Sequence, residues 1–147
     1  MRSVAALLAV LVLAPAASAC GAGEDPGACP APRPVDEPGP LVRALALDEL
    51  GVPTVSREEA ELSSATVVSE RSVTALLGRV NDALEAGGYS VLGTEDEGFE
   101  AEIFFAKGLH TNGVARITED ARCAGRTTVE VSVARGTAAP SGSPSPT

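Results

Sequence analysis

Two groups of side chains in this sequence are of the types that catalysis or metal binding requires: a histidine and a dense group of carboxylates. His110 is the only histidine. A serine or cysteine nucleophile needs a histidine base that a third group holds in place, and no serine or acid forms a recognisable motif with His110. Zinc needs several histidine or cysteine ligands. We therefore expect His110 to be a solvent-exposed loop residue, and we expect no metal and no cofactor.

The densest carboxylates are Glu95, Asp96, Glu97, Glu100 and Glu102. Paired carboxylates can hydrolyse glycosides, and ordered oxygen ligands can bind calcium. However, their spacing matches no EF-hand loop. A chain with one tyrosine and no tryptophan also lacks the aromatic platforms on which sugars stack. The sequence therefore favours a solvated turn and sheet face, with a weak calcium site and a small carboxylate enzyme as alternatives.

The cysteines must be considered together with the start of the chain. Met1 and Arg2 precede an apolar run from residue 4 to residue 13, and small residues follow from 14 to 19. This is the layout of a secretory signal peptide, and the apolar run is too short to span a bilayer. Exported proteins tend to pair their thiols, and the chain has three cysteines, so one is left over.

The segment Ala17-Ser18-Ala19-Cys20 resembles the lipobox of small bacterial lipoprotein precursors, although leucine is more usual where Ala17 stands. The abundance of Ala, Gly, Pro and Arg is similar to that of proteins from high-GC Gram-positive bacteria. The resemblance implies that the Cys20 thiol receives a diacylglyceryl group, whose two acyl chains give stable membrane attachment. Cys29 and Cys123 would then be the one possible disulfide pair. The alternative is cleavage after Ala19 and free secretion.

The charge of the chain restricts its partners. Removal of the signal peptide takes away Arg2 and leaves ten basic against 20 acidic residues, a net charge of about −10. Such a domain repels phosphate backbones and anionic headgroups. We therefore expect no nucleic-acid binding, and we expect the lipid anchor to be the contact with the membrane.

Composition divides the chain into a signal peptide (1–19), a Pro/Gly-rich lipid-anchored tether (20–40), a domain (41–135) and a disordered Pro/Ser-rich tail (136–147). If Cys29 is bonded to the domain, the free tether is residues 21–28, with a reach of about 25 Å. Residues 40–50 suit either a short helix or a strand, and Pro40 and Gly51 favour the helix.

One strong helix is predicted inside the domain, because Val73, Leu76, Leu77, Val80 and Leu84 share a helical face. Ser72 can cap its start and Gly87-Gly88 can end it. Gly78, inside the helix, suggests a close approach to the sheet. Strands are predicted over 62–68, 89–94, 99–105, 114–118 and 129–133, with Asn112-Gly113 as a hairpin turn. The fold class is therefore α+β: a small antiparallel sheet with one main amphipathic helix packed on one face.

Strand alternation places Phe104 on the same sheet face as Glu100 and Glu102, away from the helix. An exposed Phe104 could anchor a partner protein, but the more common arrangement is that Val42 or Leu45 covers it. Glu58, Glu59 and Glu61 are expected to lie in a solvated face or loop.

The sequence as a whole predicts an exported lipoprotein on the extracytoplasmic face of the cell membrane. Its small acidic domain, without enzymatic activity, would bind a ligand or a protein partner in the cell envelope. The alternative is a freely secreted binding or inhibitor protein.

Overall fold

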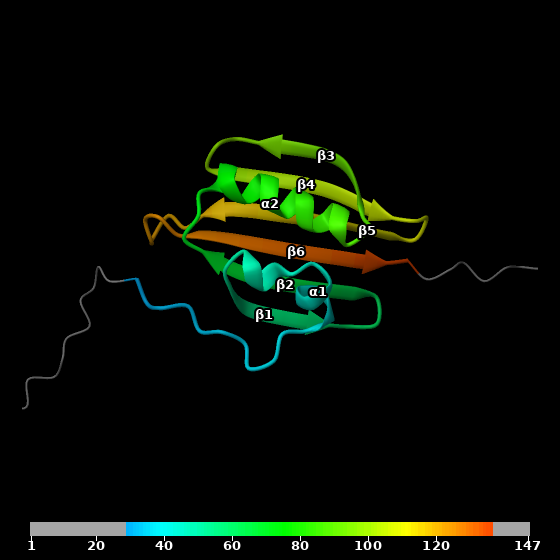
Figure 1. The fold of residues 1–147 in the computed structure, drawn as a ribbon, viewed down its shortest axis with the longest axis horizontal. Helices are drawn as coiled ribbons and strands as arrows, with labels where there is room; N and C mark the ends of the chain where they lie inside the picture. Colours follow the sequence, from blue (N-terminus) through cyan, green and yellow to red (C-terminus); the bar gives the residue numbers. More distant parts are fainter. Residues whose placement is uncertain (1–28, 137–147) are drawn as a thin grey trace, which may run out of the picture.

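The computed structural model describes residues 29–136, which form a six-stranded antiparallel sheet with helices on one face (Figure 1). The strand order is β1-β2-β6-β5-β4-β3. The predicted signal peptide, Cys20 and the tail from residue 137 lie outside the described residues. The strands are β1 (Val52–Glu58), β2 (Leu62–Ser69), β3 (Ser90–Asp96), β4 (Glu100–Lys107), β5 (Thr111–Glu119) and β6 (Thr127–Arg135). The helices are α1 (Pro40–Ala44), the 3-10 turn η1 (Leu47–Glu49) and α2 (Val73–Ala86).

The predicted fold class is confirmed. The helix α2 connects β2, near one edge of the sheet, to β3 at the opposite edge, and so crosses over the sheet (Figure 1). It packs on β3, β4 and β5, whereas α1 packs on β1 and β2. Together they cover one face and bury the core between the two layers. That core consists of Leu41, Val42, Leu45, Leu47, Leu50, Ala65, Val67, Val73, Leu76, Val80, Leu84, Ala101, Ile103, Phe105, Ala115, Ile117, Val129, Val131 and Val133.

The ends of α2 are fixed by the signals that the sequence suggests. The Ser72 hydroxyl accepts a hydrogen bond from the Ala75 amide at 3.3 Å, which satisfies one free donor of the first turn. At the other end, α2 stops at Ala86 and Gly88 adopts a positive φ of 78°, as the Gly87-Gly88 pair predicts. The Lys107 ammonium, which was not predicted to take part, donates to the Gly87 carbonyl at 2.7 Å and complements the negative end of the helix dipole.

The suggested role of Gly78 is wrong. A Cβ built on Gly78 meets no atom within 4 Å, and the residue is exposed. Gly78 therefore permits no close approach between α2 and the sheet, and it leaves the helix with a residue of low helix propensity.

Replacing Gly78 with alanine is expected to raise the free energy of unfolding by about 1 kcal/mol, because alanine restricts the unfolded chain and fits the helix without a clash. Urea denaturation measures the change. The matched control is Gly113→Ala, where the new Cβ would lie 2.4 Å from both the Phe105 ring and the Ser132 carbonyl oxygen. That variant should lose about 1–3 kcal/mol. A Gly78→Ala protein no more stable than the parent would contradict the prediction.

The predicted hairpin turn at Asn112-Gly113 is also wrong. Both residues lie within β5, where Asn112 pairs with Ala106 and Gly113 with Phe105. The chain turns earlier, at residues 108–110, where Gly108 adopts a positive φ of 66°. Glycine is required at position 113 because the Phe105 ring lies against its backbone and leaves no space for a side chain, and not because the chain turns there.

The predicted helix over 40–50 is interrupted. The chain forms α1 and then η1, and Ala46 between them has a left-handed φ of 46°. A strand over 52–58 was not predicted. Its residue Glu58 is more than a solvated acid, because its carboxylate accepts hydrogen bonds from the Ser63 hydroxyl at 2.6 Å and the Leu41 amide at 3.3 Å. Glu58 therefore ties β2 to the start of α1.

The segment 29–39 lies against the domain (Figure 1). The predicted disulfide between Cys29 and Cys123 is present, with Cα atoms 5.5 Å apart. Further along, the Val35 amide donates to the Pro53 carbonyl at 2.9 Å, and the Gly39 amide donates to the Ser56 hydroxyl at 3.0 Å. The segment, called the N-terminal arm below, therefore runs from the β5–β6 loop to the edge strand β1.

Candidate functional site

The face of the sheet opposite the helices carries no helix in the described part of the chain. We call it the open face. Cross-strand pairing aligns Glu102 with Arg116 and then with Glu130, and the next row aligns Phe104 with Val114 and Ser132. The neighbouring residues Ile103 and Phe105 are fully buried on the helix side. The structure therefore brings Glu100, Glu102 and Phe104 together on this face, as alternation predicts.

The charges on the open face are organised by Arg116. Its guanidinium donates to the Glu102 carboxylate at 2.7 Å and lies 3.2 Å from the Glu100 carboxylate. The hydrogen bond to Glu102 raises the pKa of Arg116 above its ordinary value, and the negative charges of Glu102, Glu100 and Glu130 add to this. Arg116 therefore remains a cation, but it is one cation among three carboxylates.

The aromatic residue of the open face is exposed. Phe104 is 39% accessible, and the expected cover is absent because Val42 and Leu45 are buried on the helix side. Its partner on the neighbouring edge strand is Gly93, which has no side chain to shield the ring. The adjacent Leu92, in a bulge of β3, is 68% accessible. Phe104 and Leu92 are thus two exposed apolar side chains on the neighbouring strands β4 and β3.

An acidic hollow lies along the same two strands, β3 and β4. It has a volume of about 180 Å³ and is lined by Glu95, Glu97, Glu100, Ala101 and Glu102. Glu95 stands directly opposite Glu102 across the β3–β4 pair, an arrangement in which like charges destabilise a sheet. With four carboxylates and the single guanidinium of Arg116, this end of the open face has a net charge of −3.

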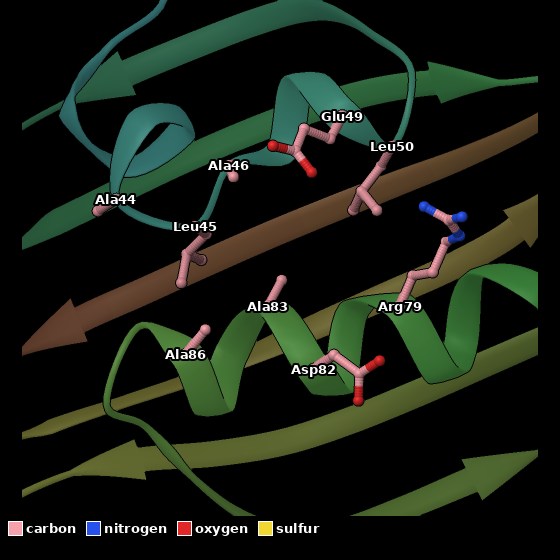
Figure 2. Close-up of a pocket in the computed structure, with 9 residues that line it drawn as sticks. All are labelled: Ala44, Leu45, Ala46, Glu49, Leu50, Arg79, Asp82, Ala83 and Ala86. Atoms are coloured by element: carbon pink, nitrogen blue, oxygen red, sulfur yellow. The ribbon is translucent and has the colours of Figure 1, made fainter.

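A larger hollow of about 570 Å³ lies on the helix side, between α1–η1 and α2 (Figure 2). Ala44 and Ala46 border one side, and Ala83 and Ala86 point into it from α2. Glu49 and Arg79 lie toward the Leu50 end. Leu45 and Leu50 are only 2% and 3% accessible, so the large apolar side chains of this groove are far less exposed than Phe104.

The remaining candidates do not join the open-face group. His110 lies in the exposed turn between β4 and β5, as expected. Cys29 and Cys123 are joined at the opposite end of β5 from that turn. Within residues 29–136, no three His, Cys, Asp or Glu side chains are arranged to hold a metal ion. No helix in that range is long and apolar enough to cross a membrane.

Comparison with models of known protein families gave no match, and comparison with curated proteins gave no significant relative.

Sequence reasoning missed Arg116 of the open-face group and the exposure of Leu92. Arg116 could have been found, because the alternation Val114, Ala115, Arg116, Ile117 places it on the polar side of a strand. The exposure of Leu92 could not be found in this way, because Leu92 lies in the β-bulge between Val91 and Gly93, which local sequence does not specify.

Proposed function

We propose that this chain is an exported, lipid-anchored protein whose acidic domain binds a protein partner in the cell envelope through the open face near Phe104. The supporting observation is that an aromatic side chain, 39% accessible, lies on a helix-free face between a glycine and a cluster of charged groups. Aromatic side chains at the centre of such patches are typical anchors of protein interfaces. The proposed role is binding and not catalysis, and neither a nucleic acid nor a cofactor is part of it.

The position of the disulfide supports a location of the acidic end of the open face near the membrane. Cys123 lies in the loop after β5, and the last residue of β5, Glu119, donates its amide to the Phe99 carbonyl of the β3–β4 turn at 3.0 Å. The acidic hollow is therefore at the same end of the sheet as Cys29. With lipid on Cys20, residues 21–28 would hold this end within about 25 Å of the bilayer, so we infer a partner close to the membrane.

Photo-crosslinking in living cells tests the binding face. A benzophenone amino acid at position 104 is expected to form a discrete adduct with another envelope protein. The same amino acid at position 74, on the exposed side of α2, is the matched control and should form none. If position 104 forms no adduct, or if both positions form the same adducts, the open face is not the binding surface.

Membrane attachment is tested by replacing Cys20 with alanine. The unchanged protein is expected in the membrane fraction and the Cys20→Ala protein in the soluble extracytoplasmic fraction, because the thioether to the two acyl chains cannot form. Mass spectrometry should find the diacylglyceryl mass on the peptide that begins at Cys20. An unmodified peptide with that start, or equal partition of the two proteins, would favour the freely secreted alternative.

A further inference from the structure

The two edges of the sheet are not equivalent. At the β1 edge, the N-terminal arm donates a hydrogen bond to Pro53, and Pro53 itself has no amide hydrogen to offer. At the β3 edge, no backbone hydrogen bond from any part of residues 29–136 other than β4 reaches the strand. The chain itself thus occupies part of the β1 edge, whereas the β3 edge is open to an additional strand.

The direction of the free backbone groups follows from the β3–β4 ladder. The Glu97 amide donates to the Glu100 carbonyl at 2.8 Å, so this pair is hydrogen-bonded across the strands. Hydrogen-bonded and non-hydrogen-bonded pairs alternate in an antiparallel ladder. The amide and carbonyl groups of Thr94 and Asp96 therefore point away from β4, toward the open edge.

The side chains at this edge define what could add to it. Glu95, Glu97, Glu100 and Glu102 surround the acidic hollow next to the strand. Because Gly93 has no side chain, a residue on an added strand could reach over it to the Phe104 ring. The edge therefore offers backbone hydrogen bonds, an apolar contact and a negative field to the same extended segment.

We propose that β3 binds an extended cationic segment of the partner protein by strand addition, with Arg or Lys side chains facing the acidic hollow and an apolar side chain on Phe104. This inference rests on the proposed function and specifies its partner. A second copy of this chain is a poorer occupant, because each mature copy has a net charge of about −10 and would bring Glu95 and Asp96 to the shared edge.

The test uses the full mature chain with Cys20→Ala, labelled for amide NMR, and a short capped peptide. Arginine and valine take turns at every second position of this peptide and threonine stands between them, so that one face of the added strand presents both arginine and valine. We expect the peptide to bind, to shift the β3 amides, and to slow hydrogen exchange at Thr94 and Asp96. A peptide with glutamate for every arginine should bind at least about tenfold more weakly, since electrostatic complementarity is lost. A peptide that is N-methylated on the amides facing β3 should not protect Thr94 and Asp96 from exchange, because it cannot complete the ladder of backbone hydrogen bonds with β3.

Protein variants give an independent readout. Glu95→Lys with Glu97→Lys should weaken binding of the arginine peptide. Asp48→Lys with Glu49→Lys, at two exposed positions of η1, makes the same change in net charge and should not weaken it. Shifts confined to the groove of Figure 2, or equal binding of the N-methylated peptide, would overturn strand addition. Dimerisation without peptide, with protection at β3, would assign the edge to a second copy.

The outcomes separate this inference from the proposed function. An adduct from position 104 in cells, combined with no binding of the arginine peptide, would leave the open face as a binding surface and refute the β3 mode. Binding of the peptide with no adduct from position 104 would refute the cellular role while the edge remains competent.

Discussion

Replacing Cys29 with serine is expected to lower the free energy of unfolding by about 4–5 kcal/mol in the chain-entropy account of cross-links. The disulfide joins residues 94 positions apart and so closes a loop that contains nearly all of the described domain. Such a loop restricts the unfolded chain strongly. The substitution also frees the N-terminal arm from the β5–β6 loop. The arm then keeps its hydrogen bond from the Val35 amide to the Pro53 carbonyl of β1. A small domain has a total stability of about 5–15 kcal/mol, so this loss is a large part of the whole.

Chemical denaturation with and without a reducing agent measures this effect. The parent protein under reducing conditions should unfold at the same denaturant concentration as Cys29→Ser, and the reductant should not change the variant. Cys29 is preferred for substitution because it is exposed, whereas Cys123 is buried and its replacement would also disturb packing. Equal denaturation midpoints for parent and variant without reductant would contradict a stabilising cross-link.

The elements that were predicted correctly are those in which local pattern and tertiary burial agree. The apolar face of α2 and its Ser72 cap define a helix without knowledge of the sheet. The valines of β6 alternate with polar residues because one face of the strand is buried. In both segments, the periodicity that predicts the element also determines which side chains reach the core.

The errors arise where a residue type has more than one physical use. Asn-Gly favours a turn by its backbone freedom, but Gly113 is used to admit the Phe105 ring. Pro53 argues against a strand, yet it is tolerated because β1 is at the edge. Which use applies depends on contacts with residues distant in sequence, and these cannot be read from a local window.

The candidate site was predictable only in part for the same reason. Alternation within β4 was enough to group Phe104 with Glu100 and Glu102. The exposure of Phe104, however, depends on where the N-terminal helices pack, and both faces of the sheet were possible positions. It also depends on the register that aligns Phe104 with Gly93. Register and layer order are properties of the assembled sheet.

Replacing Val80 with aspartate is expected to unfold the domain, with a loss of about 4 kcal/mol or more. Val80 has no accessible surface and packs between α2 and the sheet. The apolar residues around it offer no cation, and an isolated buried carboxylate is strongly disfavoured. The variant therefore has to protonate the new side chain or open the helix–sheet interface. Circular dichroism and the rate of limited proteolysis at neutral pH measure the outcome.

The matched control is Thr74→Asp, which adds the same charge to the same helix at an exposed position in its first turn. That turn contains no acidic residue in the parent protein, so the new carboxylate should interact favourably with the helix dipole and add about 0.3–1 kcal/mol. A gain at position 74 with collapse at position 80 would show that burial, and not charge on α2, determines the result. A folded Val80→Asp protein with parent-like protease resistance would mean that α2 does not cover the sheet in solution.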